Sequence, residues 1–294
     1  MHSNMTQTHT NTSLNAQQSG TIELKDLGTV HRLGFGAMRI TGPGIWGEPA
    51  DREVARSVVR RAVELGVDFI DTADAYGPDI SEQIIAEAIH PYGDVRIGTK
   101  VGNTRQGPDS WIPLARAEYI RQQTELSLRK LKVDRLDLQQ LHRIDPKTST
   151  DEQFSELAAL QSEGKVAALG LSEVTVEEIK EAQKYFTVST VQNRYNLTDK
   201  KSEEVLDYCE AQGIGFIPWA PISGGELAQN GPIQEAARHL NAQPAQVALA
   251  WLLKRSPVML PIPGTGSVAH LEENIAAASI ELDDDTFAAI AAAA

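Results

Sequence analysis

The sequence holds a single cysteine, Cys209, so no intrachain disulfide can form. That usage is typical of a reducing compartment, and we expect a cytoplasmic protein. Positive charge is also scarce: 27 Lys and Arg stand against 40 Asp and Glu, and the net charge is −13. Such an acidic surface disfavours nucleic acid and anionic membranes as partners. Apolar runs stay far below the roughly 20 residues of a membrane span, so no membrane helix is expected.

Residues 1–20 contain almost no apolar side chains and are rich in Ser, Thr, Asn, Gln and His. Without an apolar stretch, this segment does not match a secretory signal. Its composition predicts a disordered N-terminal tail. Residues 21–294 are long enough for one large domain, and we expect a single one.

Strand-like and helix-like segments alternate along the rest of the chain. Strands are predicted at residues 33–38, 67–70, 95–99, 135–141, 166–171, 188–192, 215–219 and 258–262. Helices are predicted at residues 51–65, 81–89, 116–131, 151–162, 176–183, 202–212, 244–254 and 268–277. This alternation predicts an α/β fold, a (β/α)8 TIM barrel. The rival, an open doubly wound sheet, would carry Gly-x-Gly-x-x-Gly after its first strand, and that motif is missing.

A short segment precedes the barrel. Residues 22–24 and 30–32 alternate in the manner of strands, and Asp26-Leu27-Gly28 between them is typical of a turn. We expect a β-hairpin that caps one end of the barrel.

Four polar side chains fall where predicted strands end. Asp71 and Tyr76 follow the second strand, Lys100 follows the third, and His142 follows the fourth. In (β/α)8 enzymes the C-terminal strand ends meet on one face, where the chemistry takes place. An acid, a phenol, an ammonium and an imidazole on that face indicate proton delivery to a polarised oxygen. Each residue alone could be a helix cap or a packing residue; all four in register indicate a site.

The same residues lie in a pattern that resembles the aldo-keto reductase superfamily over about residues 21–290. Its strongest segment is Phe-Ile-Asp-Thr-Ala-Asp-Ala-Tyr-Gly at 69–77. Gly-Thr-Lys at 98–100, Gln-Leu-His-Arg at 140–143, Gly-Leu-Ser at 170–172 and Val-Gln-Asn-Arg-Tyr-Asn at 191–196 support it. Ile-Pro-Gly-Thr at 262–265, followed by His-Leu-Glu-Glu-Asn at 270–274, is most similar to bacterial reductases of the pyridoxal-reductase-like group.

The resemblance implies reduction of an aldehyde or ketone to an alcohol by a nicotinamide cofactor. Tyr76 would then be the general acid, and Lys100 would lower its pKa. Asp71 would pair with Lys100, and His142 would orient the carbonyl. Tyr76 and His142 are the implied substrate contacts. The loop after the first strand places Trp46 either as a wall of the substrate pocket or as a surface anchor, and Trp111 and Tyr195 are weaker candidates. Which carbonyl compound is reduced, and the oligomeric state, stay open.

The resemblance also implies NADP(H) as cofactor, with NAD(H) as a second candidate. The residues implied to bind it are Met38, Ser172, Gln192, Trp219, Ala220, Pro221, Ile222, Gly224, Gly264, Thr265, Gly266, Ser267, His270, Glu273 and Asn274. Two positions depart from the family pattern. Glu173 replaces an Asn, so it cannot donate to the nicotinamide carboxamide. His270 replaces an Arg, so the grip on a 2′-phosphate is weaker.

Two other functions remain open at this point. Lys100 could form a Schiff base in a lyase if its pKa were depressed, although a carboxylate partner such as Asp71 keeps a lysine protonated. The chain could also hold the cofactor without turnover, as channel β-subunits similar to this superfamily do while regulating a partner. His142 favours catalysis, because those subunits carry another residue there. No His and Cys residues have the spacing of metal ligands, and no metal site is expected.

Overall fold

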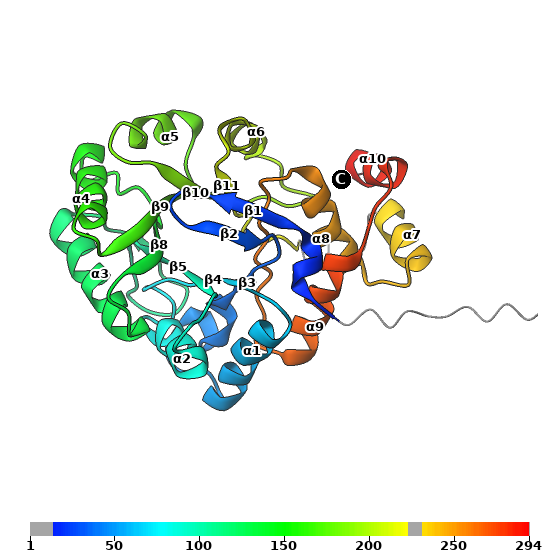
Figure 1. The fold of residues 1–294 in the computed structure, drawn as a ribbon, viewed down its shortest axis with the longest axis horizontal. Helices are drawn as coiled ribbons and strands as arrows, with labels where there is room; N and C mark the ends of the chain where they lie inside the picture. The colour runs from blue at the N-terminus through cyan, green and yellow to red at the C-terminus, as the bar shows by residue number, and fades with distance from the viewer. Residues whose placement is uncertain (1–13, 223–230, 294) are drawn as a thin grey trace, which may run out of the picture.

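A ring of parallel strands forms the centre of the molecule (Figure 1). The computed structural model describes residues 14–222 and 231–293. One sheet runs in the order β11-β10-β9-β8-β5-β4-β3, all neighbours parallel. Its strands are β3 (Phe35–Gly36), β4 (Phe69–Asp71), β5 (Arg96–Val101), β8 (Leu136–Leu141), β9 (Val166–Ser172), β10 (Val188–Gln192) and β11 (Gly215–Phe216). The antiparallel pair β6 (Asn103–Thr104) and β7 (Ile112–Pro113) lies outside this sheet.

Residues 258–264 close the ring. Met259 bridges to Phe216 of β11, and Gly264 bridges to Gly36 of β3, both in parallel. The approach leaves no room for a side chain, since a Cβ on Gly36 would lie 2.6 Å from the carbonyl oxygen of Ile262. The segment predicted as the eighth strand thus lies between β11 and β3 but pairs with each through a single bridge and does not form a regular strand. Pro261 and Pro263 explain this, because neither has an N–H to donate to a ladder.

Helices surround the strands. They are α1 (Arg52–Glu64), α2 (Ile80–Ile89), α3 (Ala117–Leu131), α4 (Thr150–Ser162), α5 (Val176–Ala182), α6 (Glu203–Gln212), α7 (Gly231–His239), α8 (Pro244–Arg255), α9 (Val268–Ala276) and α10 (Asp284–Ala292). The sequence did not predict α7 and α10, which pack side by side next to α8 (Figure 1). The apolar residues of α10 are mostly alanines, which make a weak periodic signal. The alternation of strands and helices confirms the predicted (β/α)8 barrel.

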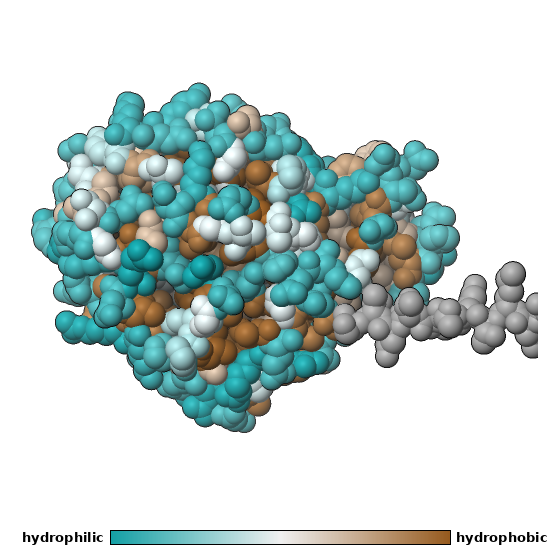
Figure 2. Space-filling model, in the orientation of Figure 1, coloured by the Kyte–Doolittle hydropathy of each residue, from teal (hydrophilic) through white to brown (hydrophobic). Residues whose placement is uncertain are grey.

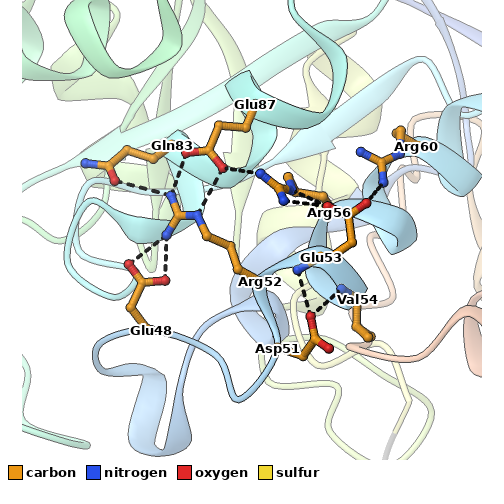
Figure 3. A network of polar contacts seen from close by, with 9 residues as sticks. All are labelled: Glu48, Asp51, Arg52, Glu53, Val54, Arg56, Arg60, Gln83 and Glu87. Carbon is orange, nitrogen blue, oxygen red and sulfur yellow. Dashed lines mark hydrogen bonds and ion pairs between the residues drawn. The ribbon is translucent and has the colours of Figure 1, made fainter.

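The start of α1 is tied to the loop before it and to α2. Asp51 caps the helix, accepting from the backbone amides of Glu53 and Val54. Arg52 donates to Glu48 in the loop and to Glu87 on α2 (Figure 3). Each exposed ion pair contributes only about 0–1 kcal/mol, but together they restrain the loop on which Trp46 lies.

The predicted hairpin is present as β1 (Thr21–Leu24) and β2 (Gly28–His31), and it lies across the ring of strands (Figure 1). Leu24 is buried against Gly215, at the start of β11. The backbone carbonyl of Lys25 accepts from Ser189 Oγ on β10 at 2.6 Å. Both contacts lie near the first residues of their strands. The hairpin therefore covers the N-terminal end of the barrel, and the chemistry belongs to the opposite end.

Part of the segment expected to be a disordered tail, residues 1–20, is structured. Ala16–Ser19 form a 3-10 helix capped by Asn15, and the side chain of Ala16 is fully buried. The amide of Ala16 donates to the carbonyl of Leu65 at the end of α1, at 2.8 Å. The segment is held by the burial of one small side chain and by a few backbone hydrogen bonds. Amino-acid composition does not predict such contacts. Residues 1–13 lie outside the described part of the chain.

Hydrophilic residues cover most of the face seen in Figure 2, with hydrophobic patches between them. Among the described residues, no helix combines the length and apolar character needed to cross a bilayer. Cys209 is buried, and burial raises the pKa of its thiol to about 12, so it is protonated at neutral pH.

Candidate active site

Three neighbouring strands bring the predicted catalytic residues together. Asp71 ends β4, Lys100 lies near the end of β5, and His142 directly follows β8. Because these strands are adjacent in the sheet, their C-terminal ends meet on one face. Tyr76 comes from the loop between β4 and α2. That loop is anchored to β5, since the amide of Asp74 donates to the Lys100 carbonyl at 3.2 Å.

Lys100 is the centre of this group. Its Nζ donates to Asp71 Oδ2 at 2.5 Å, to the Thr72 carbonyl at 2.9 Å and to Tyr76 Oη at 3.1 Å. The side chain is 0% exposed. An ammonium has three N–H bonds, so these three acceptors match its full donor capacity. The lysine is fixed between the acid and the phenol.

The electrostatics keep Lys100 protonated. Burial pulls its pKa down, but the negative charge of Asp71 and the bonds to Asp71 and Tyr76 outweigh burial, and the pKa is raised. A Schiff-base nucleophile needs the neutral amine, so this environment disfavours the lyase alternative.

The pKa of Tyr76 differs from the sequence prediction. Lys100 lowers it as expected, but burial raises it more strongly and Asp71 raises it further, so the pKa lies above its ordinary value. The lysine charge is largely offset by its own carboxylate partner. The phenol is therefore protonated at neutral pH, which is the form a general acid must have.

His142 is a neutral imidazole in this setting. Its side chain is 6% exposed, and burial lowers its pKa well below the ordinary value, with help from Lys100, Arg143 and Arg105. The His142 and Tyr76 ring centroids are 5.9 Å apart, edge to face. Among the described residues, nothing hydrogen-bonds the buried His142 Nδ1. A buried polar atom of this kind fits a site completed by a bound molecule.

Two glutamines hold the other oxygen of the acid. Asp71 Oδ1 accepts from Gln192 Nε2 at 2.8 Å and from Gln140 Nε2 at 3.1 Å. The sequence reasoning missed Gln140, although its position two residues before His142 on β8 places both on the same face of the strand. Gln192 was expected to bind the cofactor. Its NH2 group serves Asp71, which leaves its carbonyl oxygen as the group that could accept from a carboxamide.

The other residues implied to bind the nicotinamide lie at the next strand ends. Ser172 ends β9 and Trp219 follows β11. Ser172 Oγ accepts from Arg143 Nη1 at 3.1 Å, and a hydroxyl that accepts can still donate. Ala220, Pro221 and Ile222 continue from Trp219, whereas Gly224 lies outside the described residues.

Glu173 has a role that the sequence left open. Its Oε1 accepts from the indole Nε1 of Trp219 at 2.5 Å and from the backbone amide of Arg194 at 2.7 Å. The residue has a φ of +56°, a left-handed backbone conformation that costs energy in a residue with a Cβ. The carboxylate thus fixes Trp219 in place.

Neutral donors gather where α9 begins. Ser267 is the N-cap residue, but its side chain makes no cap hydrogen bond, and Thr265 Oγ1 accepts from the Ser267 amide at 3.1 Å. Gly266 lies against the 3-10 helix Ala37–Ile40, where Met38 is half-buried; Gly264 adjoins Gly36. On α9, His270 and Glu273 are exposed and Asn274 is buried. Amides and hydroxyls at a helix N-terminus fit the phosphates of a dinucleotide.

The three further aromatic substrate candidates lie in different places. Trp111 lies 6.2 Å from Tyr76 and 6.0 Å from His142, ring centroid to centroid, so it adjoins the site. Trp46 is partly exposed on the loop before α1. Tyr195 was a wrong candidate: its side chain is fully buried, and its ring stacks on Trp251 of α8. The sequence showed that Tyr195 follows a strand but not that its ring points into the helix layer.

Comparison with known proteins gives the family. The sequence model of the Aldo/keto reductase family matches residues 32–294. An oxidoreductase of Schizosaccharomyces pombe is 50% identical over 285 residues, 97% of this chain and 93% of that protein. Pyridoxine 4-dehydrogenase of Escherichia coli is 41% identical over 273 residues, 90% of this chain and 96% of that protein.

Solved structures agree. An aldo-keto reductase from Klebsiella pneumoniae in complex with NADPH superposes with a TM-score of 0.79 at 25% identity, over 92% of this chain and 93% of that one. A thermostable aldo-keto reductase bound to epalrestat gives a TM-score of 0.81 at 26% identity, over 94% of this chain and all of the other. The chain belongs to the aldo/keto reductase family and is an oxidoreductase.

Proposed function

We propose that the protein reduces an aldehyde or ketone to an alcohol with a reduced nicotinamide cofactor, and that Tyr76 is the general acid. The observation that carries this proposal is the position of Lys100 Nζ, 2.5 Å from Asp71 Oδ2 and 3.1 Å from Tyr76 Oη. A fixed ammonium beside a protonated phenol is an arrangement suited to giving a proton to an oxygen that gains charge.

Each side chain has a distinct task. Tyr76 Oη donates a hydrogen bond to the carbonyl oxygen and transfers its proton as that oxygen becomes an alkoxide. Lys100 stabilises the phenolate that Tyr76 becomes, and Asp71 holds Lys100 in reach. Neutral His142 orients the carbonyl with the one N–H of its imidazole ring. When bound, the cofactor supplies the hydride that reaches the carbonyl carbon.

NADP(H) is the proposed cofactor, with NAD(H) as the weaker one. Thr265, Ser267 and the first amides of α9 offer donors for a phosphate, and an NADPH complex of a relative supports this choice. His270 is an exposed imidazole where an arginine would grip the phosphate more firmly, so we expect a modest preference.

A planar aldehyde of the pyridoxal type is the proposed substrate. Two observations support it: the relative named pyridoxine 4-dehydrogenase is 41% identical, and the rings of Tyr76, His142 and Trp111 lie at the site. Aromatic side chains favour flat substrates through stacking and edge contacts. We place this small-molecule reaction in the cytoplasm.

A steady-state screen tests the proposal. Pyridoxal, benzaldehyde and short aliphatic aldehydes are each assayed with NADPH and with NADH, following loss of the reduced nicotinamide. We expect turnover with NADPH and the highest kcat/KM for a planar aldehyde. Tight binding of NADPH without turnover of any carbonyl compound would favour the cofactor-holding alternative. An adduct on Lys100 trapped by borohydride would favour the lyase.

A further inference from the structure

One guanidinium beside the site is bonded entirely to backbone carbonyls. Arg105 lies in the hairpin loop between β6 and β7, and all its donor atoms are used. Nε donates to Ser110 O at 2.8 Å; Nη1 donates to Ile45 O at 2.7 Å and Ala75 O at 2.8 Å; Nη2 donates to Gly44 O at 2.8 Å and Gly107 O at 3.3 Å.

These five carbonyls come from three different loops. Gly44 and Ile45 belong to the loop of Trp46, Ala75 directly precedes Tyr76, and Gly107 and Ser110 belong to the loop of Trp111. A guanidinium is planar and holds its donors in a fixed fork, so it fixes the loops relative to one another. Backbone bonds add to this, since the Gly47 amide donates to Gly77 O at 2.6 Å and the Asp109 amide to Gly44 O at 3.0 Å.

The same guanidinium lies over an aromatic ring of the site. Arg105 Cζ is 3.7 Å from the Trp111 ring centroid and 5.8 Å from that of Trp46. Trp111 in turn forms a triangle with Tyr76 and His142, in which each pair of ring centroids is 5.9 to 6.2 Å apart. One face of Trp111 is thus occupied by a cation, and its position depends on the loop that Arg105 braces.

We propose that Arg105 is a positioning residue that sets specificity: it fixes Trp111 as the aromatic wall beside Tyr76 and so favours planar carbonyl substrates over short aliphatic ones. This rests on the proposed reductase function. Arg105 does not touch the reacting atoms. It acts through the ring it covers, and its effect belongs to substrate binding more than to the chemical step, because Tyr76 is held independently by Lys100.

Arg32 provides a matched control. Its guanidinium also donates to backbone carbonyls, those of Ser19, Leu253 and Ser256, and burial lowers its pKa as burial lowers that of Arg105. It lies next to the hairpin at the opposite end of the barrel. Arg32→Met therefore removes a comparable set of bonds without touching the site.

The test compares Arg105→Met, Arg105→Lys and Arg32→Met with the wild type. For Arg105→Met we expect KM for benzaldehyde to rise about tenfold, the equivalent of ~1.4 kcal/mol. KM for propanal, kcat and the Kd of NADPH should change less than about threefold, because these do not depend on the aromatic wall. Arg105→Lys should recover part of the loss, since it keeps the cation but not the fork. An unchanged ratio of the two KM values, or the same change in Arg32→Met, would overturn the proposal.

Hydrogen exchange without substrate separates this inference from the reductase function. In Arg105→Met the amides of residues 42, 44–47, 107 and 109–111 should exchange faster than in the wild type and in Arg32→Met. Unchanged protection of these amides would refute the bracing role of Arg105, whatever the activity of the wild type. Failure of the wild type to reduce any aldehyde would refute the proposed reductase function instead. If Arg105→Met does not fold, Trp111→Leu takes its place: the same rise in KM for benzaldehyde is expected, and a wild-type KM contradicts the wall.

Discussion

The indole Nε1 of Trp219 donates to Glu173 Oε1 across 2.5 Å, and this bond links the segments that follow β9 and β11. The same oxygen accepts from the Arg194 amide. The backbone therefore fixes the carboxylate, and the carboxylate in turn fixes the indole. Glu173 stands where the family pattern has an amide, and its interactions here are with the protein itself. We propose that the nicotinamide stacks on this indole, which loses less conformational freedom on binding because it is fixed in advance.

The first prediction concerns that bond. Glu173→Ala should weaken binding of reduced dinucleotide about fivefold, since one hydrogen bond contributes about 1 kcal/mol. Glu173→Gln should lie near the wild type, because its amide oxygen can still accept. Quenching of tryptophan emission during titration with NADPH gives the Kd. The exposed Glu177 on α5 supplies the control variant, Glu177→Ala, which should bind normally. Equal losses in the Ala and Gln variants would show that the charge of Glu173 matters and not its bond.

The buried ion pair predicts a pattern of stabilities. Lys100→Met leaves Asp71 charged at 2% exposure, with only neutral partners, and should reduce the free energy of unfolding by about 3–5 kcal/mol. The double variant Lys100→Met/Asp71→Asn removes the unpaired charge and should recover part of that loss. Urea unfolding of both variants measures it. A double variant no more stable than the single one would mean that Asp71 is not left as a costly unpaired charge.

His142 predicts a pH dependence of stability. Its folded-state pKa is lowered, so below about 6.5 the unfolded chain binds the proton more readily than the folded one. The contribution of neutral His142 to the free energy of unfolding is fully present above that pH and is lost on acidification. Relative to His142→Gln, the wild type should lose free energy of unfolding between about pH 7.5 and about pH 5.5. Asp74 and Glu82, whose pKa values burial raises, are common to both proteins and cancel. A constant difference over this range would contradict a buried neutral imidazole.

The dinucleotide preference can be changed at one exposed position. His270→Arg should strengthen binding of NADPH selectively, toward the lower end of the about 1.5–3 kcal/mol typical of charge-assisted bonds, because the site is open to water. Calorimetric Kd values for NADPH and NADH in both proteins provide the comparison. Equal gains for both cofactors, or none, would show that residue 270 does not face the 2′-phosphate.

The sequence predicts the fold well wherever apolar runs and glycine turns act locally. The strands and the hairpin follow from such runs. The eighth strand differs in detail because Pro261 and Pro263 cannot join a ladder. The helix α10 was missed because alanine gives little contrast between its faces; α7 was missed although Ile233, Ala236 and Ala237 recur at helical spacing on its buried face.

The site shows a sharper limit. Asp71, Tyr76, Lys100 and His142 could be found because each ends or follows a recognisable strand. The role of Arg105 could not, since its acceptors lie 2 to 61 residues away in the chain and are all backbone carbonyls. The pKa of Tyr76 was predicted to fall, but it rises. Its sign depends on the balance between burial and nearby charges, which only the packed structure sets.

Turnover by Tyr76→Phe tests the central claim most directly. Removing the phenol proton should reduce single-turnover reduction of a good aldehyde by about two to four orders of magnitude, as expected for a lost general acid. The Kd of NADPH should stay within about twofold, because the proton is used in the transition state and not in holding the dinucleotide. Near-normal turnover in this variant, with NADPH bound normally, would contradict the assignment of Tyr76 as the acid.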